Sequence, residues 1–425
     1  MRFLPISRWS HEFSRSDVLR ADLLAGLTGA IVVLPQGIAF SMLAGLPAQF
    51  GLYAAMVPCI LAALFGSSRA MVTGPANAIS LTTMALIAPL ATVGSEAYIS
   101  LVLTLSFLVG VSQCLIGLSG AGKYVDRVPH SVIVGFTVGA SVLIINSQLG
   151  SLLGMDLARG MSVIGSVERI ASEVLAHNLD WHAPALVLVT LFVIALWRPL
   201  NKKVPSMLVA VLLGSLVAML IESIIGGTFR YERVATISEV LPPLTLPDLR
   251  APILNSLVGP ALVMLLLAST EAMAIARSVA LRRQDTFCAN QEFLGQGIAN
   301  IGGAFFSSYP ASGSFNRSGV NVAAGAQTPI SAISSAIFLM LILGFVGPLI
   351  EFLPKVVISA LLLAVAWGLI DLRQIKQEIK AGLPDSLPMM VTAGVTIFFS
   401  LEWAIVFGIL LAASLKRCVR PSSPR

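Results

Sequence analysis

From Leu23 to the C-terminus, long apolar stretches alternate with short polar segments. About fourteen of these stretches have roughly the 17–25 residues that a membrane-spanning helix requires. They begin near residues 23, 46, 74, 97, 130, 183, 204, 253, 290, 312, 329, 354, 385 and 402. The pattern predicts an all-α polytopic membrane protein.

The third and the tenth stretch are interrupted. Gly74 and Pro75 break the third, and Pro310 and Gly313 break the tenth, so no continuous helix is expected at either place. The two stretches occupy equivalent positions if the chain consists of two halves of seven spans. Paired broken helices in inverted repeats indicate a transport site near the middle of the membrane. Plain kinks or close helix contacts remain the alternative explanation.

Composition and charge agree with a membrane protein. Only 11% of the 425 residues are charged, against about 25% in a soluble domain. With the N-terminus inside, 20 of the 27 Lys and Arg residues lie on the cytoplasmic side and 6 on the outer side. This asymmetry follows the positive-inside rule, so the net charge of +6 reflects topology and not a nucleic-acid partner. We expect a multi-pass protein of the inner (cytoplasmic) membrane with both termini cytoplasmic.

Two ionisable residues stand inside predicted spans. Arg317 is the one basic residue that belongs to neither side, and Glu271 is the only acid in the interior of the eighth span. A charge within the membrane costs several kcal/mol and marks a transport pathway or an ion relay. Mutual neutralisation of Glu271 and Arg317 remains open as a structural explanation, and it would not exclude transport.

The helix breaks supply further candidate chemistry. Half-helices that begin near Ala76 and Ser314 would present unpaired N–H groups, and each N-terminus carries about half a positive charge. If the two ends face each other, they form an anion site, to which Arg317 adds a full charge. Gln36 lies at the centre of the first span, with Phe40 one turn further on the same face. Considered alone, Gln36 could equally join two helices, and Phe40 could be ordinary core.

Several segments resemble one family. The chain resembles the sulfate-permease (SulP) family of anion transporters over nearly all of residues 20–415. The most specific piece is "DLLAGLTGAIVVLPQGIAFSMLAGLPAQFGLYAAMVP" (22–58). Supporting pieces are "VTGPANAIS" (72–80), "VPHSVIVGFTVGASVLI" (128–144), "NQEFLGQGIANIGGAFF" (290–306) and "SGSFNRSGVNVAAGAQTPIS" (312–331).

The resemblance implies seven plus seven inverted spans, arranged as a mobile core domain and a gate domain. It implies an anion held between the third and tenth helices and moved by an elevator-like shift of the core. The implied parts are an N-terminal cytoplasmic segment (1–20), a core (21–122 and 252–350), a gate (123–251 and 351–418) and a tail (419–425).

The resemblance also implies the site residues. The positions that match substrate-binding positions of the family are Gln36, Phe40, Gly74, Pro75, Ala76, Ser314, Asn316 and Arg317. Glu271 matches an acidic position that is associated with sodium or proton coupling in prokaryotic relatives, so a sodium ion near it is one option. Asn316 stands where some relatives have serine, which leaves the anion preference open. Neither a cofactor nor a structural metal is expected.

The function that follows is secondary active transport of a small anion such as sulfate, bicarbonate, chloride or a dicarboxylate. Transport would be coupled to protons or sodium, or would run as exchange, and a homodimer remains open. A nucleobase transporter of similar fold is the first alternative, but Arg317 stands where such sites favour a carboxylate. An uncoupled anion channel or voltage-responsive motor is the second alternative. An enzyme has little support, because HExxH, GxSxG and clustered His/Cys sets are missing. Most family members continue into a cytoplasmic STAS domain, whereas this sequence ends about ten residues after its last predicted span.

Overall fold

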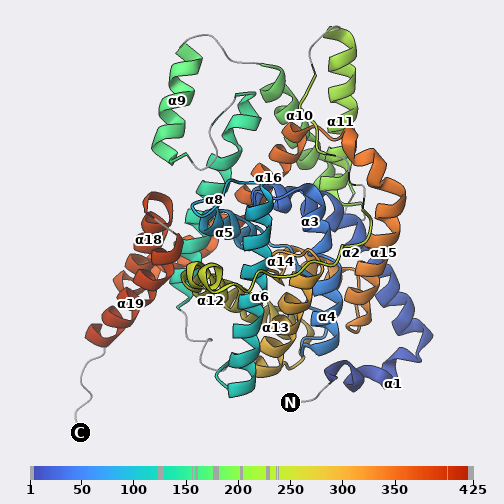
Figure 1. Cartoon of the computed structure of the whole chain (residues 1–425), viewed down its shortest axis with the longest axis vertical. Helices are drawn as coiled ribbons and strands as arrows, with labels where there is room; N and C mark the ends of the chain where they lie inside the picture. Colours follow the sequence, from blue (N-terminus) through green and yellow to red (C-terminus); the bar gives the residue numbers. More distant parts are fainter. Residues whose placement is uncertain are drawn as a thin grey trace. The chain divides into compact units, whose positions relative to one another are not determined.

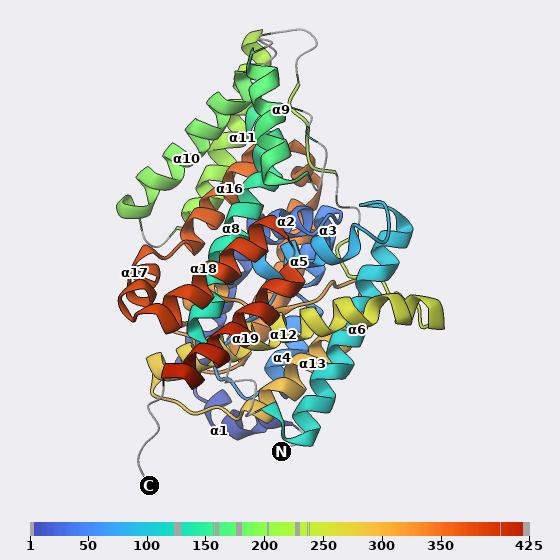
Figure 2. The ribbon, with the colours of Figure 1, turned by 90° about the vertical axis from the view of Figure 1, so that its left-hand side faces the viewer.

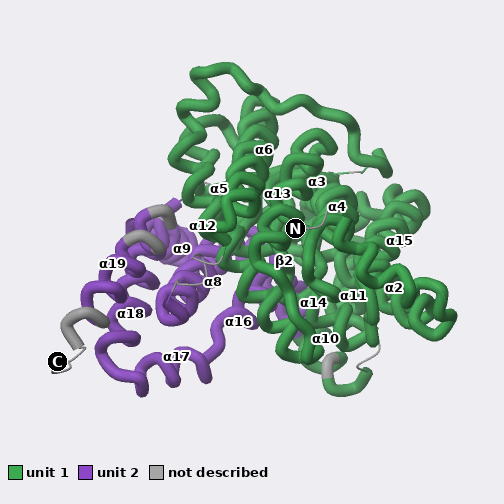
Figure 3. Tube along the Cα trace, turned by 90° about the horizontal axis from the view of Figure 1, so that it is seen from below, with its two compact units in different colours: residues 1–126, 192–358 green, residues 127–191, 359–425 purple. Residues whose placement is uncertain are grey.

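The structure is a computed structural model that describes residues 4–122, 129–155, 157, 161–175, 181–201, 204–225, 230–235, 237, 239–399 and 401–419. These residues are mostly helical. The chain forms two compact units, unit 1 with residues 1–126 and 192–358 and unit 2 with residues 127–191 and 359–425 (Figure 3).

Unit 1 contains the N-terminal helices and the two interrupted segments (Figure 1). Its first elements are η1 (Pro5–Trp9), α1 (Ser10–Phe13), α2 (Ser16–Leu43), α3 (Ala48–Tyr53), α4 (Val57–Phe65), β1 (Thr73–Gly74), α5 (Asn77–Ile87) and α6 (Glu96–Ser119). Its later elements are α11 (Ser206–Ile225), α12 (Ala251–Arg283), α13 (Ala289–Phe305), β2 (Ser312–Gly313), α14 (Phe315–Ala323), α15 (Ile330–Val346) and η2 (Gly347–Phe352).

Unit 2 is smaller, and its helices α18 and α19 run side by side (Figure 2). It contains α8 (His130–Leu153), α9 (Val163–Leu175), α17 (Leu372–Lys380), α18 (Leu383–Phe398) and α19 (Leu401–Val419). Helices α10 (His182–Leu200) and α16 (Lys355–Leu369) each begin in one unit and end in the other.

Among the described residues, eight helical segments are long and apolar enough to cross a membrane, and three more apolar helices are shorter. This confirms a polytopic helical protein, while the count of fourteen spans and the inverted repeat remain predictions. The predicted core segments 21–122 and 252–350 lie entirely in unit 1. The predicted gate segment 123–251 is divided between the units, because residues 127–191 belong to unit 2 and the others to unit 1. The assignment of core and gate domains remains a prediction.

Glycines let helices of unit 1 pack closely. A Cβ on Gly110 of α6 would come within 2.6 Å of the Ile301 backbone nitrogen, and a Cβ on Gly297 of α13 would come within 2.7 Å of the Gly110 carbonyl oxygen. Helices approach so closely in membranes only where small residues line the contact. Helix α13 is therefore held tightly against α6.

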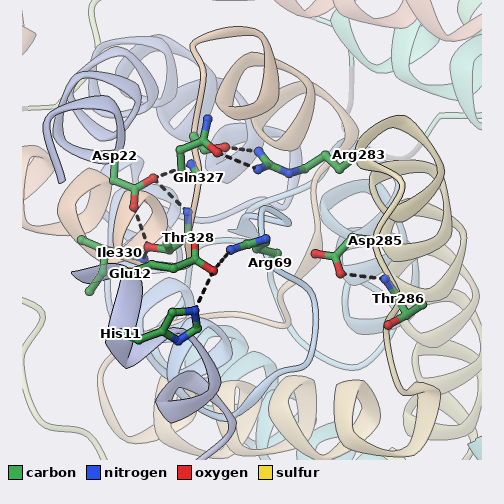
Figure 4. A network of polar contacts seen from close by, with 11 residues as sticks. His11, Glu12, Asp22, Arg69, Arg283, Asp285, Thr286, Gln327, Thr328 and Ile330 are labelled. Carbon is green, nitrogen blue, oxygen red and sulfur yellow. Dashed lines mark hydrogen bonds and ion pairs between the residues drawn. The ribbon is translucent and has the colours of Figure 1, made fainter. Parts of the chain in front are cut away.

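Polar contacts tie the ends of several unit 1 elements together (Figure 4). Asp22 of α2 accepts hydrogen bonds from the backbone N–H groups of Gln327 (2.6 Å) and Thr328 (3.0 Å), in the loop before α15. Arg283, the last residue of α12, donates to Gln327 Oε1 (3.2 Å) of the same loop. Glu12 of the N-terminal segment forms an ion pair with Arg69, which precedes β1. These contacts fix the segment that precedes β1 and the loop that follows α14.

Candidate functional site

The two interrupted segments meet as a short antiparallel strand pair. Strand β1 pairs with β2, with Thr73 opposite Gly313 and Gly74 opposite Ser312. The backbone N–H of Ser314 also donates to the Val72 carbonyl (3.0 Å). Helix α5 begins three residues after β1, and α14 begins two residues after β2. The N-termini of both half-helices therefore lie beside the same strand pair, where the sequence predicted them.

The two helix starts differ in their caps. The side chain of Ser314, the N-cap of α14, accepts a hydrogen bond from the Arg317 N–H (3.4 Å). Ala76, the N-cap of α5, has no side chain that could accept one. The first N–H groups of a helix have no partner within the helix, so those of α5 are available to an anion. Asn77, the first residue of α5, adds an Nδ2 atom that is buried and has no partner among the described residues.

Arg317 lies inside unit 1, with only 2% of its surface exposed. Its Nη1 donates to the Thr73 carbonyl (2.9 Å), and its Nη2 lies 3.8 Å from Cys59 Sγ. Its Nε has no hydrogen-bond partner within the described part of the chain. Gly74 makes room for the guanidinium, because a Cβ there would collide with Nη1. The guanidinium thus touches strand β1 itself and retains unused hydrogen-bonding capacity.

The ion pair between Arg317 and Glu271 that the sequence left open is not present among the described side chains. Glu271 Oε2 is buried, and none of the residues that the structure describes forms a hydrogen bond with it. Its helix nevertheless runs past β2, since the Ser312 hydroxyl donates to the Ala268 carbonyl (2.8 Å), one turn before Glu271. A Cβ on Gly313 would lie 3.5 Å from the Ala272 Cα. The structure therefore places an unpaired acid within a turn of the strand pair.

The remaining predicted residues lie on α2 and α14. Gln36 and Phe40 are buried on α2, which packs against both α5 and α14. Gln36 Nε2 lies 3.5 Å from Met207 Sδ, and its Oε1 has no partner among the described residues. Asn316 is exposed, whereas its neighbour Arg317 is buried, so the two side chains face different directions from the first turn of α14.

A column of polar residues on α13 supports the strand pair, and the sequence analysis did not single it out. Asn300 accepts from the Ala311 N–H (2.8 Å) and donates to the Ala311 carbonyl (3.0 Å), just before β2. Gln296 donates to Thr73 Oγ1 (2.8 Å) in β1 and to Glu292 Oε1 (3.2 Å). Polar residues four positions apart on an apolar helix were the signal that could have revealed this column.

Glu292 completes the column as a buried carboxylate that accepts several hydrogen bonds. Its Oε2 accepts from the N–H groups of Ser67 and Ser68, both at 2.8 Å. A chain of hydrogen bonds therefore runs from Glu292 through Gln296 to Thr73, whose carbonyl oxygen accepts from Arg317. One helix thus holds both strands of the pair in position.

One family of known proteins matches most of this sequence. The model of the sulfate permease family matches residues 19–392. The chain belongs to the sulfate permease family. This agrees with the predicted choice of a transporter over an enzyme.

Three known proteins show how similar this chain is to its relatives in sequence or fold. Sulfate transporter 4.1, chloroplastic, of Arabidopsis thaliana is 29% identical over 95% of the chain, and the match spans 59% of the plant protein. The transmembrane domain of the cyanobacterium bicarbonate transporter BicA is 26% identical with a TM-score of 0.79, covering 95% of this chain and 97% of that one. The murine Slc26a9 anion transporter in its inward-facing state is 21% identical, with a TM-score of 0.87 and coverage of 98% and 71%, and it shares the fold.

Proposed function

We propose that this chain is a secondary active transporter of a small anion, of the sulfate, bicarbonate or dicarboxylate class. The observation that carries the proposal is the strand pair, which brings two helix N-termini and the buried Arg317 side chain into one region. The helix ends contribute about half a positive charge each. Together with Arg317 they offer about two positive charges, which suits a monovalent or divalent anion.

The uncapped start of α5 is the part of the site that we assign to the anion itself. Its N–H groups have no side-chain cap, and Asn77 Nδ2 and Arg317 Nε have no partner among the described residues. Buried donors without partners are costly, and an oxyanion would satisfy them. Gln36 and Phe40 on α2, and Ser314 and Asn316 on α14, would complete the walls of this site.

Glu271 is the residue that we assign to coupling. An unpaired buried carboxylate oxygen can take up a proton, and a sodium ion would require further oxygen ligands beside it. Binding of either cation would change the charge near the strand pair and so change the affinity for the anion.

An elevator-type movement accounts for transport through this site. The strand pair, α13 and α12 are joined by the hydrogen bonds described above, so the half-helices cannot separate without breaking them. Alternating access would then result from displacement of this assembly and not from movement of one tip against the other. The excess of basic residues in alternate loops supports cytoplasmic termini in a cytoplasmic membrane.

The purified chain in liposomes tests the proposal. Uptake of labelled sulfate, bicarbonate, chloride and a dicarboxylate should be measured under separate proton and sodium gradients. We expect gradient-driven uptake of at least one of these anions, and uptake of none would contradict the proposal. Uptake of a labelled nucleobase instead would favour the alternative class.

Calorimetry with the transported anion tests the role of the guanidinium. Arg317→Ala should weaken binding by tenfold or more, because a charged hydrogen bond contributes about 1.5–3 kcal/mol. Arg317→Lys, which keeps the charge, is the matched control and should lose less. Affinity in Arg317→Ala equal to that of the wild type would exclude Arg317 from the anion site.

A further inference from the structure

Helix α17 (Leu372–Lys380) is a short polar helix between two apolar ones. Asp371 caps it by accepting the N–H groups of Arg373 (2.8 Å) and Gln374 (3.2 Å). Two residues separate it from α16, and two residues separate it from α18 (Figure 3). Because both neighbours are apolar helices, these short connections confine α17 to the surface of the membrane.

Helix α17 is amphipathic, with its apolar residues on one face. At 100° per residue, Leu372, Ile375 and Ile379 share one face of the helix. The side chain of Leu372 is 61% exposed and that of Ile379 is 55% exposed. Such a face, with a polar remainder, is typical of helices that lie in the membrane interface.

The basic and acidic residues of α17 lie on opposite flanks of its apolar face. Arg373, Lys376 and Lys380 lie together on the flank next to the apolar face, and all three are exposed. On the opposite flank, Glu378 Oε1 lies 3.9 Å from His130 Nε2, at the start of α8 in the same unit. The contact with α8 fixes the acidic flank towards the protein, so the basic flank points away from it.

We propose that α17 binds anionic phospholipid headgroups of the cytoplasmic leaflet through Arg373, Lys376 and Lys380. The apolar face would enter the acyl region beneath them. Charge complementarity selects this partner: the cytoplasmic leaflet carries anionic lipid, and a basic residue near it gains about fivefold in affinity. The proposal rests on the cytoplasmic placement of this loop and does not depend on which anion is transported.

Trp367 provides a local probe, because it lies near the end of α16 and is 71% exposed. The full chain is placed in bilayers of phosphatidylcholine with brominated phosphatidylglycerol, and separately with brominated phosphatidylcholine. The fluorescence of Trp367 is obtained by subtraction of a Trp367→Phe variant. Stronger quenching by the brominated phosphatidylglycerol at equal mole fraction measures its enrichment around α17.

Two variants, one that removes a positive charge from α17 and one that moves it, separate local binding from general attraction. Lys376→Gln should lower the preference for phosphatidylglycerol about fivefold. Adding Gln374→Lys to Lys376→Gln restores the net charge of the chain but places it on the side of α17 that faces away from the apolar face. This double variant should not recover the preference for phosphatidylglycerol. Equal quenching by both lipids in the wild type, or full recovery in the double variant, would overturn the proposal.

The same face could instead contact a second copy of the chain. The mass of the purified protein is therefore compared between the wild type and Ile379→Gln. We expect the same oligomeric state in both and a weaker preference for phosphatidylglycerol in the variant. Dissociation of an oligomer in Ile379→Gln, with unchanged lipid preference, would assign the face to a protein partner and overturn the proposal.

Discussion

The missing cap of α5 allows a direct test of where the anion binds. Ala76 has φ −131° and ψ 147°, the extended conformation of an N-cap residue, but its methyl group cannot accept a hydrogen bond. Asparagine at this position would accept one from the first turn of α5. We expect Ala76→Asn to raise the free energy of unfolding by about 1 kcal/mol. It should weaken anion binding by a similar free energy, about fivefold, because one N–H group cannot fully serve both partners.

Ala76→Asp adds a charge to the same cap. A carboxylate about 5 Å from a bound monovalent anion repels it by about 3 kcal/mol at an effective dielectric constant of 20. The variant should therefore bind the anion more than 100-fold more weakly. Its folding should gain less than that of the asparagine variant, because Ala76 is only 3% exposed and the helix N-terminus offsets only part of the hydration that a buried carboxylate loses.

Calorimetric affinity and thermal unfolding of the purified chain are measured for both variants. Ser95→Ala is the matched control, because Ser95 caps α6 by accepting the Tyr98 N–H (3.1 Å) and lies outside the strand pair. It should lower stability by about 1 kcal/mol and leave anion affinity unchanged. If Ala76→Asp is more stable than the wild type and still binds the anion equally well, the N-terminus of α5 does not hold the anion.

Three further changes test the rest of the site. Glu271→Gln should abolish gradient-driven uptake in liposomes while calorimetric anion binding persists; unchanged coupled uptake would rule out a coupling role. Gly74→Ala should weaken anion binding severalfold, because the new Cβ displaces the Arg317 guanidinium. Gly313→Ala is its control and should have a smaller effect, because the new Cβ meets the end of a flexible methionine side chain; equal effects would argue against the guanidinium. Asn300→Ala should lower the free energy of unfolding by about 2–5 kcal/mol, because it leaves both backbone groups of Ala311 unpaired; a loss below 1 kcal/mol in chemical denaturation would contradict the support role of α13.

The sequence predicted the parts of the site whose causes are local. Gly74-Pro75 and the Pro310–Gly313 segment interrupt their helices through local backbone restrictions, so the starts of α5 and α14 could be placed to within a residue. A charge inside an apolar stretch is equally visible, which is why Arg317 and Glu271 were identified. The family membership predicted from the short motifs is confirmed by the match over residues 19–392.

The contacts that assemble the site could not be predicted, because they join residues far apart in the chain. Cys59 stands in an apolar stretch that gives no sign of a role, yet its sulfur lies beside the Arg317 guanidinium. The sequence also left open whether Arg317 is neutralised by Glu271, and only the fold shows that it contacts the Thr73 carbonyl instead. Glu292, Gln296 and Asn300 belong to a family motif, and their four-residue spacing places them on one face of a helix. Their role depends on which helix faces the strand pair.

The hold of α13 on both strands has a consequence for the energetics of transport. Gln296 holds β1 through Thr73, and Asn300 holds the residue that precedes β2. If the assembly moves as one body, as proposed above, the same donors would surround the anion on both sides of the membrane, and the anion would not be passed from one set of ligands to another. Its intrinsic dissociation constant should then be nearly equal on the two sides of the membrane, so inward and outward transport should approach half-saturation at similar anion concentrations.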